Sequence, residues 1–136
     1  MAIDLPWGAG TFLQAKDGVG AVTRSGYLHK GLAIAHDGWG EPRSRTLWTL
    51  FHIGSGGAFL QMIGDVATVF PVATEIAECG DWTLFDMPDG WKQTDPELGK
   101  KVFDILTKNP QAKPTTAFIR DIDPESHRAV IAAREG

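Results

Sequence analysis

A chain of 136 residues, with 43% hydrophobic and 22% charged residues, has the size and composition of one globular domain. Its only cysteine, Cys79, excludes an intramolecular disulfide and a zinc site built from cysteines. No apolar run approaches the ~20 residues that span a bilayer, and the N-terminal segment has Asp4 in place of a basic signal region. We therefore expect a single domain over residues 1–136 that lies in the cytoplasm and does not contact a membrane.

The N-terminal part of the chain predicts short strands joined by tight turns. Strands are expected over 11–16 and 20–24, with Asp17-Gly18 between them as a typical hairpin turn. Residues 27–35 predict the longest regular strand, because large and small side chains would lie on opposite faces: Leu28, Leu32 and Ile34 against Gly31, Ala33 and Ala35.

Residues 45–80 predict the centre of the fold. The strand 47–53 is apolar on both faces, as in a strand that is covered on both sides. The glycine-rich turn 54–57 supplies the positive φ values of a hairpin, and the strand 58–63 returns antiparallel. A helix is expected to follow over 69–79, with its apolar residues on one face.

The caps of that helix are predicted from local chemistry. Thr68 is expected at the N-cap, Pro71 in the first turn and Gly80 as the end. Further along, Thr94 and Glu97 have the capping-box spacing of a second helix over 96–108.

The C-terminal part completes an α+β fold. We expect an antiparallel meander of about five or six strands, formed by residues 11–63 plus 82–85, that packs against the helix at 69–79. Helices at 96–108 and 124–134 follow, and residues 109–123 are expected to be a loop leading to a weakly amphipathic last helix.

The sequence contains no catalytic or metal-binding motif. The four histidines lack a metal-ligand spacing, and the glycines form neither a complete G-x-G-x-x-G nor a phosphate loop. We therefore expect no catalytic residue, no bound metal and no cofactor. The enzymatic alternative is a small enzyme whose site is assembled from the scattered residues His52, Asp86 and Asp89, although His52 fits a hydrogen-bonded core histidine.

Charge is concentrated in one region. Residues 65–97 contain eight acidic residues and one lysine, a net charge of −7, which leaves +3 for the rest of a chain whose net charge is −4. The expected binding residues of this acidic surface are Glu75, Glu78, Asp81, Asp86 and Asp89.

Two tryptophans are expected in a binding surface. Trp39 and Trp91 each follow an Asp-Gly step in a loop, where an indole can be exposed and anchor a partner. Trp48 and Trp82 lie in apolar runs and are expected in the core.

The leading hypothesis is a non-catalytic binding protein whose acidic surface engages a basic protein surface. A phage or mobile-element inhibitor of a defence system, of the anti-restriction or anti-CRISPR type, would have this chemistry, because carboxylates can occupy a phosphate-binding groove. A homodimer is a further possibility. The alternative is a nucleic-acid-binding module that uses basic residues of the N-terminal strands: Lys16, Arg24, Lys30, Arg43 and Arg45.

Overall fold

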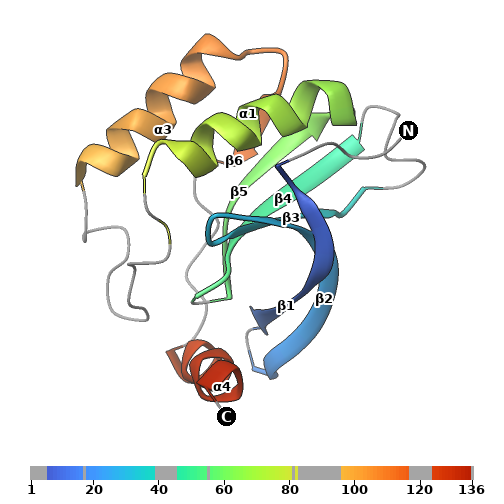
Figure 1. Cartoon of the computed structure of the whole chain (residues 1–136), viewed down its shortest axis with the longest axis vertical. Helices are drawn as coiled ribbons and strands as arrows, with labels where there is room; N and C mark the ends of the chain where they lie inside the picture. The colour runs from blue at the N-terminus through green and yellow to red at the C-terminus, as the bar shows by residue number, and fades with distance from the viewer. Residues whose placement is uncertain are drawn as a thin grey trace.

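The computed structural model describes residues 6–16, 18–38, 46–54, 56–80, 82, 96–116 and 124–135. The elements in these ranges, in chain order, are β1 (Gly8–Lys16), β2 (Gly20–His29), β3 (Leu32–His36), β4 (Thr46–His52), β5 (Gly57–Gly64), α1 (Val66–Glu78), α3 (Pro96–Lys108), β6 (Lys113–Thr116) and α4 (Pro124–Glu135). The strands form one antiparallel six-stranded sheet in the order β1-β2-β3-β4-β5-β6 (Figure 1). This arrangement confirms the predicted α+β class and the strand meander.

The first hairpin and the glycine turn agree with the sequence. β1 pairs with β2 along its whole length, from Gly8↔Leu28 to Lys16↔Gly20, and Gly18 takes a φ of 76° in the turn. β4 returns into β5 through Gly56, whose φ is 72°. In both turns a glycine takes a backbone conformation that other residues rarely adopt.

The prediction of one strand over 27–35 is wrong. Lys30 and Gly31 take φ values of 50° and 87°, and they form a two-residue turn that separates β2 from β3. Positive φ at both central residues is the geometry of a tight hairpin turn. Because of this turn, Leu28 and Leu32 lie on opposite faces of the sheet. Leu28 is instead the cross-strand neighbour of Ala33.

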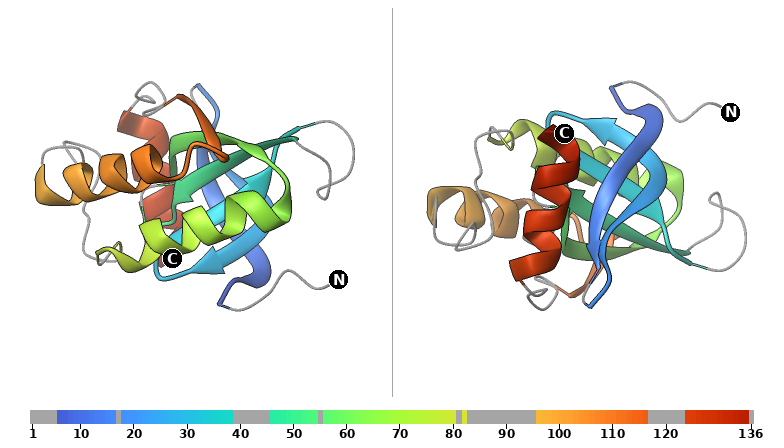
Figure 2. Two further views of the ribbon diagram at one scale, coloured as in Figure 1. Left: turned by 90° about the horizontal axis from the view of Figure 1, so that it is seen from above. Right: turned by 90° about the horizontal axis from the view of Figure 1, so that it is seen from below.

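One face of the sheet is covered by α1 and α3 (Figure 2, left). Side chains of the three central strands meet apolar side chains of both helices there. This main core includes Leu32 and Ile34 of β3, Trp48 and Leu50 of β4, Leu60 and Met62 of β5, Val69, Val72, Ala73 and Ile76 of α1, and Leu98, Val102 and Ile105 of α3. Trp82 also lies in it, so the core positions expected for Trp48 and Trp82 are confirmed.

The opposite face is covered by the chain's own first hairpin. The sheet curls so strongly that the backbone N–H of Ala15, in β1, donates to the carbonyl of Gly56 at 2.9 Å. A second small core, of Phe12, Ala33, Ala35 and Phe51, forms inside this curl. Seen from below, β1 and α4 lie across the later strands (Figure 2, right).

The last helix closes one end of the curled sheet. The hydroxyl of Ser126 in α4 donates to the carbonyl of Lys16 at 2.9 Å, and Val130 is fully buried. A Cβ at Gly56 would come within 2.8 Å of the Val130 side chain, so α4 packs directly on the β4–β5 turn. The helices predicted at 96–108 and 124–134 are thus present, the second one residue longer.

Helix α1 begins three residues before its predicted start. Asp65 is the N-cap, and its carboxylate accepts a hydrogen bond from the Thr68 backbone N–H at 2.8 Å. An aspartate satisfies the unpaired N–H groups at a helix start, so the cap lies at Asp65 instead of Thr68. Pro71 therefore lies inside the helix. Both Pro71 and Ala67 are exposed, which leaves water to satisfy the Ala67 carbonyl that loses its helical partner.

The sixth strand lies outside the segment in which it was expected. Residues 113–116, within the predicted loop 109–123, form β6 and pair with β5. Trp82 has a helical-turn geometry, and residues 83–85 lie outside the described residues. The Trp82 indole N–H donates to the carbonyl of Ile76 at 2.9 Å. This bond holds Trp82 at the end of α1, so that it does not pair with the edge of the sheet.

None of the helices in the described ranges has both the length and the apolar content needed to cross a bilayer.

Gly26 should be essential to the curl of the sheet. A Cβ there would lie 2.7 Å from the Ile34 carbonyl oxygen and 3.1 Å from the Phe12 ring, whereas a Cβ at Gly8 would meet nothing within 4 Å. Gly26→Ala should lower the free energy of unfolding in urea by about 1–3 kcal/mol because of overpacking. The matched control, Gly8→Ala, should change it by less than about 0.5 kcal/mol. Equal effects of the two variants would contradict this packing.

Candidate functional site

The described part of the acidic surface lies at the C-terminal end of α1. Glu75 and Glu78 are both exposed, and the last turn of α1 contains no basic residue. A helix C-terminus carries a partial negative charge, so acidic side chains there are unfavourable and reinforce the local negative potential. α3 shows the usual arrangement instead, with Glu97 in its first turn and Lys108 in its last.

The two glutamates differ in their surroundings. The carboxylate of Glu78 lies 3.3 Å from His29 Nε2. The Glu78 side chain is 48% exposed and the His29 side chain 13%. The His29 ring also packs edge-on against Trp7 at 5.4 Å between centroids, and the Trp7 indole N–H donates to Thr74 at 2.8 Å. Among the described residues, Glu75 has no ion-pair partner.

The other five residues predicted for this binding surface all lie outside the described residues. These are Trp39, Trp91, Asp81, Asp86 and Asp89. Their participation in one surface with Glu75 and Glu78 therefore remains a prediction.

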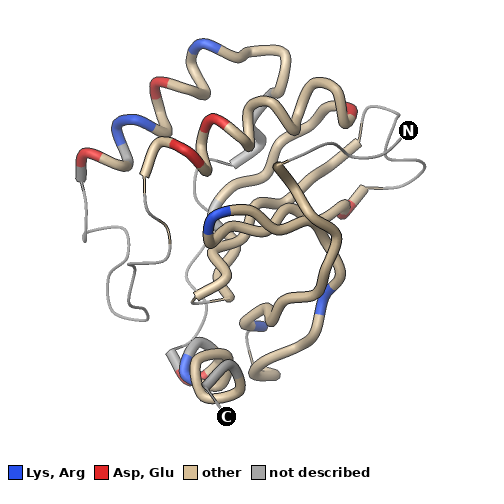
Figure 3. The backbone as a smooth tube through the Cα atoms, viewed as in Figure 1, with Lys and Arg blue, Asp and Glu red and all other residues tan. Residues whose placement is uncertain are grey.

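The structure does not bring the described basic candidates together. Lys16 ends β1, Lys30 lies in the turn after β2, and the ten residues of β2 separate these two ends of the hairpin. At about 3.3 Å per residue, that strand is roughly 33 Å long. Arg43 and Arg45 lie outside the described residues. Figure 3 likewise shows lysines and arginines scattered over strands and helices.

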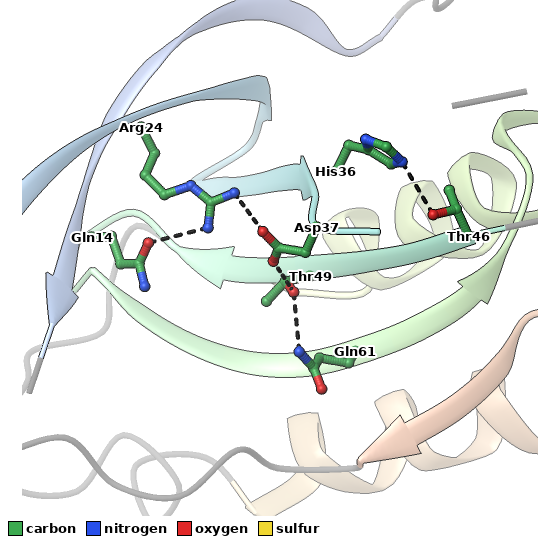
Figure 4. Close-up of polar contacts among 7 residues, drawn as sticks. All are labelled: Gln14, Arg24, His36, Asp37, Thr46, Thr49 and Gln61. Atoms are coloured by element: carbon green, nitrogen blue, oxygen red, sulfur yellow. Dashed lines mark hydrogen bonds and ion pairs between the residues drawn. The ribbon is translucent and has the colours of Figure 1, made fainter. Parts of the chain in front are cut away.

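Arg24 is engaged in a polar row that the sequence analysis did not find (Figure 4). Its guanidinium bonds the carboxylate of Asp37 at 2.7 Å and the side-chain carbonyl of Gln14 at 3.2 Å. The Thr49 hydroxyl donates to the other oxygen of Asp37, and the Gln61 amide donates to Thr49 at 3.4 Å. The row thus crosses from β1 to β5 on the face of the sheet that α1 and α3 leave uncovered.

The order of donors along this row is fixed by its members. Arginine has no acceptor, so Gln14 must present its carbonyl oxygen to Arg24. Thr49 gives its one hydroxyl proton to Asp37, so Gln61 must present its NH₂ group to Thr49. The charges of Arg24 and Asp37 compensate each other, and Arg24 also lies over the Phe51 ring at 5.3 Å. Arg24 is therefore not a cation available to a phosphate.

The register of the sheet explains why the sequence hid this row. Tyr27 pairs with Ile34, and extending that register by three residues places Arg24 opposite Asp37. Thr49 and Gln61 are a direct cross-strand pair. The opposition of Arg24 and Asp37 can be predicted only if the turn at Lys30 is known.

His52 lies in the core and is almost completely buried. It is 2% exposed, and its Nε2 lies 2.7 Å from the Trp82 carbonyl oxygen. A carbonyl only accepts, so Nε2 carries the hydrogen. Asp86 and Asp89, its proposed catalytic partners, lie outside the described residues.

His36 and Thr46 form a pair that resembles a catalytic base and its nucleophile. His36 Nε2 lies 3.2 Å from the Thr46 hydroxyl. A Cβ at Gly38 would lie 1.6 Å from that hydroxyl oxygen, so the backbone at Gly38 covers it on one side. Thr46 itself is only 6% exposed, which leaves little room for a substrate.

The remaining reactive groups give no metal or redox centre in the described ranges. No group of three or more histidine, cysteine, aspartate or glutamate side chains is placed to hold a metal ion there. Burial raises the pKa of the Cys79 thiol, and the nearby Lys101 opposes this shift in part. The thiol donates to the Ile76 carbonyl at 3.1 Å. Cys79 is therefore a packing residue whose thiol is less readily ionised than an ordinary cysteine.

Comparison with protein-family models, with curated proteins and with solved structures finds no match to this chain.

The Arg24–Asp37 pair should contribute to stability. Asp37→Asn keeps the shape of the side chain but removes the charge that Arg24 and Thr49 contact, and it should lower the free energy of unfolding by about 1–3 kcal/mol. Asp104→Asn, at an exposed carboxylate of α3, is the control and should have little effect. Urea denaturation measures both. If the two variants unfold at the same urea concentration, the polar row does not stabilise the sheet.

Proposed function

We propose that this chain is a non-catalytic binding protein whose acidic surface, within residues 65–97, engages a basic surface of another protein. The observation that carries this proposal is the pair Glu75 and Glu78, exposed in the last turn of α1. A carboxylate at a helix C-terminus costs about 0.3–1 kcal/mol. A partner with lysine or arginine side chains would convert that cost into a favourable contact.

The physical reason for such a partner is electrostatic. Two carboxylates and the carbonyl groups of a helix end lie together, and Glu75 has no cation beside it in the described part of the chain. Surfaces of opposite charge attract over about 10 Å at ~0.1 M salt, which speeds encounter and selects among partners. Binding should therefore weaken as salt rises.

Apolar contacts would supply the remaining affinity. Charged rims mainly set the rate of association, whereas buried aromatic residues dominate the free energy of most interfaces. Trp39 and Trp91 are the proposed anchors, and Asp81, Asp86 and Asp89 extend the acidic surface around them. The proposed roles of these five residues rest on the sequence alone.

A nucleic-acid-handling protein is the class of partner that fits this chemistry. Its phosphate-binding groove is basic, and carboxylates on a rigid helix can occupy such a groove in place of phosphates. In this form, the chain would act as an inhibitor of a defence system of the anti-restriction or anti-CRISPR type.

Charge reversal on α1 tests the proposal. In a pull-down from extract of the native host, the wild-type chain should recover a partner with a basic surface, and more of it at low than at moderate salt. Glu75→Lys with Glu78→Lys should reduce recovery about tenfold or more, which corresponds to ~1.4 kcal/mol.

A matched control separates the acidic surface from net charge. Asp104→Lys with Glu125→Lys changes the net charge by the same amount at two exposed positions, on α3 and α4, and should leave recovery unchanged. The proposal would be ruled out if no partner is recovered. It would also be ruled out if binding does not respond to salt or to the charge reversal of Glu75 and Glu78.

A further inference from the structure

The two edges of the sheet are protected very differently. β6, at one edge, has only four residues, and its sequence KPTT includes a lysine and a proline. Shortness, lysine and proline are the common means by which proteins prevent a sheet edge from pairing with another strand. β1, at the other edge, has nine residues, GAGTFLQAK, with no proline and no charge before Lys16.

Half of the β1 edge is covered within the chain. The Ala15 N–H points away from β2 and bonds Gly56, and a Cβ at Gly56 would lie 2.9 Å from the Leu13 carbonyl oxygen. Backbone groups of an edge strand alternate in direction along an antiparallel pair. Ala9 and Thr11 therefore also point their N–H and C=O groups away from β2.

The other half, from Gly8 to Thr11, is open. All four residues are exposed, and no described residue forms a hydrogen bond to the outward groups of Ala9 or Thr11. The register with β2 is regular along this stretch, with no bulge to turn the edge aside. Small side chains also allow another strand to approach closely. The open edge therefore has the features of a pairing site.

We propose that the open edge Gly8–Thr11 pairs antiparallel with the same edge of a second copy of this chain. An antiparallel pair about a two-fold axis at Gly10 places Ala9 of one copy opposite Thr11 of the other. Each such pair exchanges two backbone hydrogen bonds, because the outward groups of both residues face the partner. The edge strand has no charged residue before Lys16, so no like charges of the two edges face each other across the axis.

This inference does not depend on the proposed function. The dimer uses the free side of β1, whereas the described part of the acidic surface lies on α1, so either can fail while the other holds. A pair of joined edges would present two acidic surfaces on one assembly. It would also bury an edge that otherwise invites uncontrolled association.

Concentration-dependent mass is the first measurement. Sedimentation of the full chain from low micromolar to millimolar concentration should show the mass rising from 14.7 kDa toward twice that value. Thr11→Pro removes one outward N–H without removing a bond to β2, and should keep the chain at 14.7 kDa. Thr11→Val keeps the N–H and should dimerise like the wild type. Circular dichroism checks that each variant is folded.

Complementary charges test the register itself. Ala9→Lys with Thr11→Lys places lysine opposite lysine across the axis, and Ala9→Glu with Thr11→Glu places glutamate opposite glutamate. Each double variant should be monomeric alone, and an equimolar mixture should form a heterodimer. A wild-type chain that stays monomeric throughout, or double variants that dimerise alone as well as the wild type does, would overturn the proposal. The latter result would place the contact on another surface.

Discussion

The fold depends on burying the central strands β3 and β4 on both faces. Every residue from Leu32 to Ala35 is buried, and so is every residue from Trp48 to Phe51. Helices α1 and α3 cover one face of these strands, and among the helices of the described ranges only α4 packs on the other side, at one end of the curled sheet. The β1–β2 hairpin covers the other face by curling across, which requires the close approach at Gly26 and the hydrogen bond from Ala15 to Gly56. The same curl brings Gln14 and Arg24 within reach of Asp37, so the polar row is a consequence of covering the second face.

This arrangement decides which surfaces remain for a partner. The interior of the curl is filled by aromatic and small side chains, and the charges of Arg24 and Asp37 are matched within it. Two outward features of the described residues stand out. One is the C-terminal end of α1, where Glu75 and Glu78 oppose the helix dipole, and the other is the first half of β1, where the outward backbone groups of Ala9 and Thr11 have no partner among the described residues. Both features are unfavourable for an isolated chain, whereas every buried side-chain nitrogen and oxygen atom of the described residues has a hydrogen-bond partner. Local rules that a sequence breaks without compensation usually mark function.

Much of the architecture could be predicted from local sequence chemistry, whereas contacts between residues far apart in the sequence could not. The turn at 54–57, the apolar face of α1 and the bounds of α3 follow from glycine positions, 3.6-residue periodicity and a capping box. The turn at Lys30 was hidden because lysine rarely takes a positive φ and because the sequence pattern of alternating large and small residues continues through positions 30 and 31, although the faces on which the side chains lie do not. β6 was hidden because its sequence, with Pro114, is typical of a loop. The row from Gln14 to Gln61 joins residues of five segments, and no spacing in the sequence reveals it before the register is known.

Native-state hydrogen exchange tests most directly whether β3 and β4 are the centre of the structure. Amides of Ala33 to Ala35 and of Trp48 to Phe51 should exchange only through global unfolding. Their exchange free energies should then equal the free energy of unfolding measured in urea, and should exceed those of α4 and of the open end of β1. Exchange of the β3 and β4 amides at a lower free energy than those of α4 would show that the two covering layers do not hold these strands, and would contradict the account.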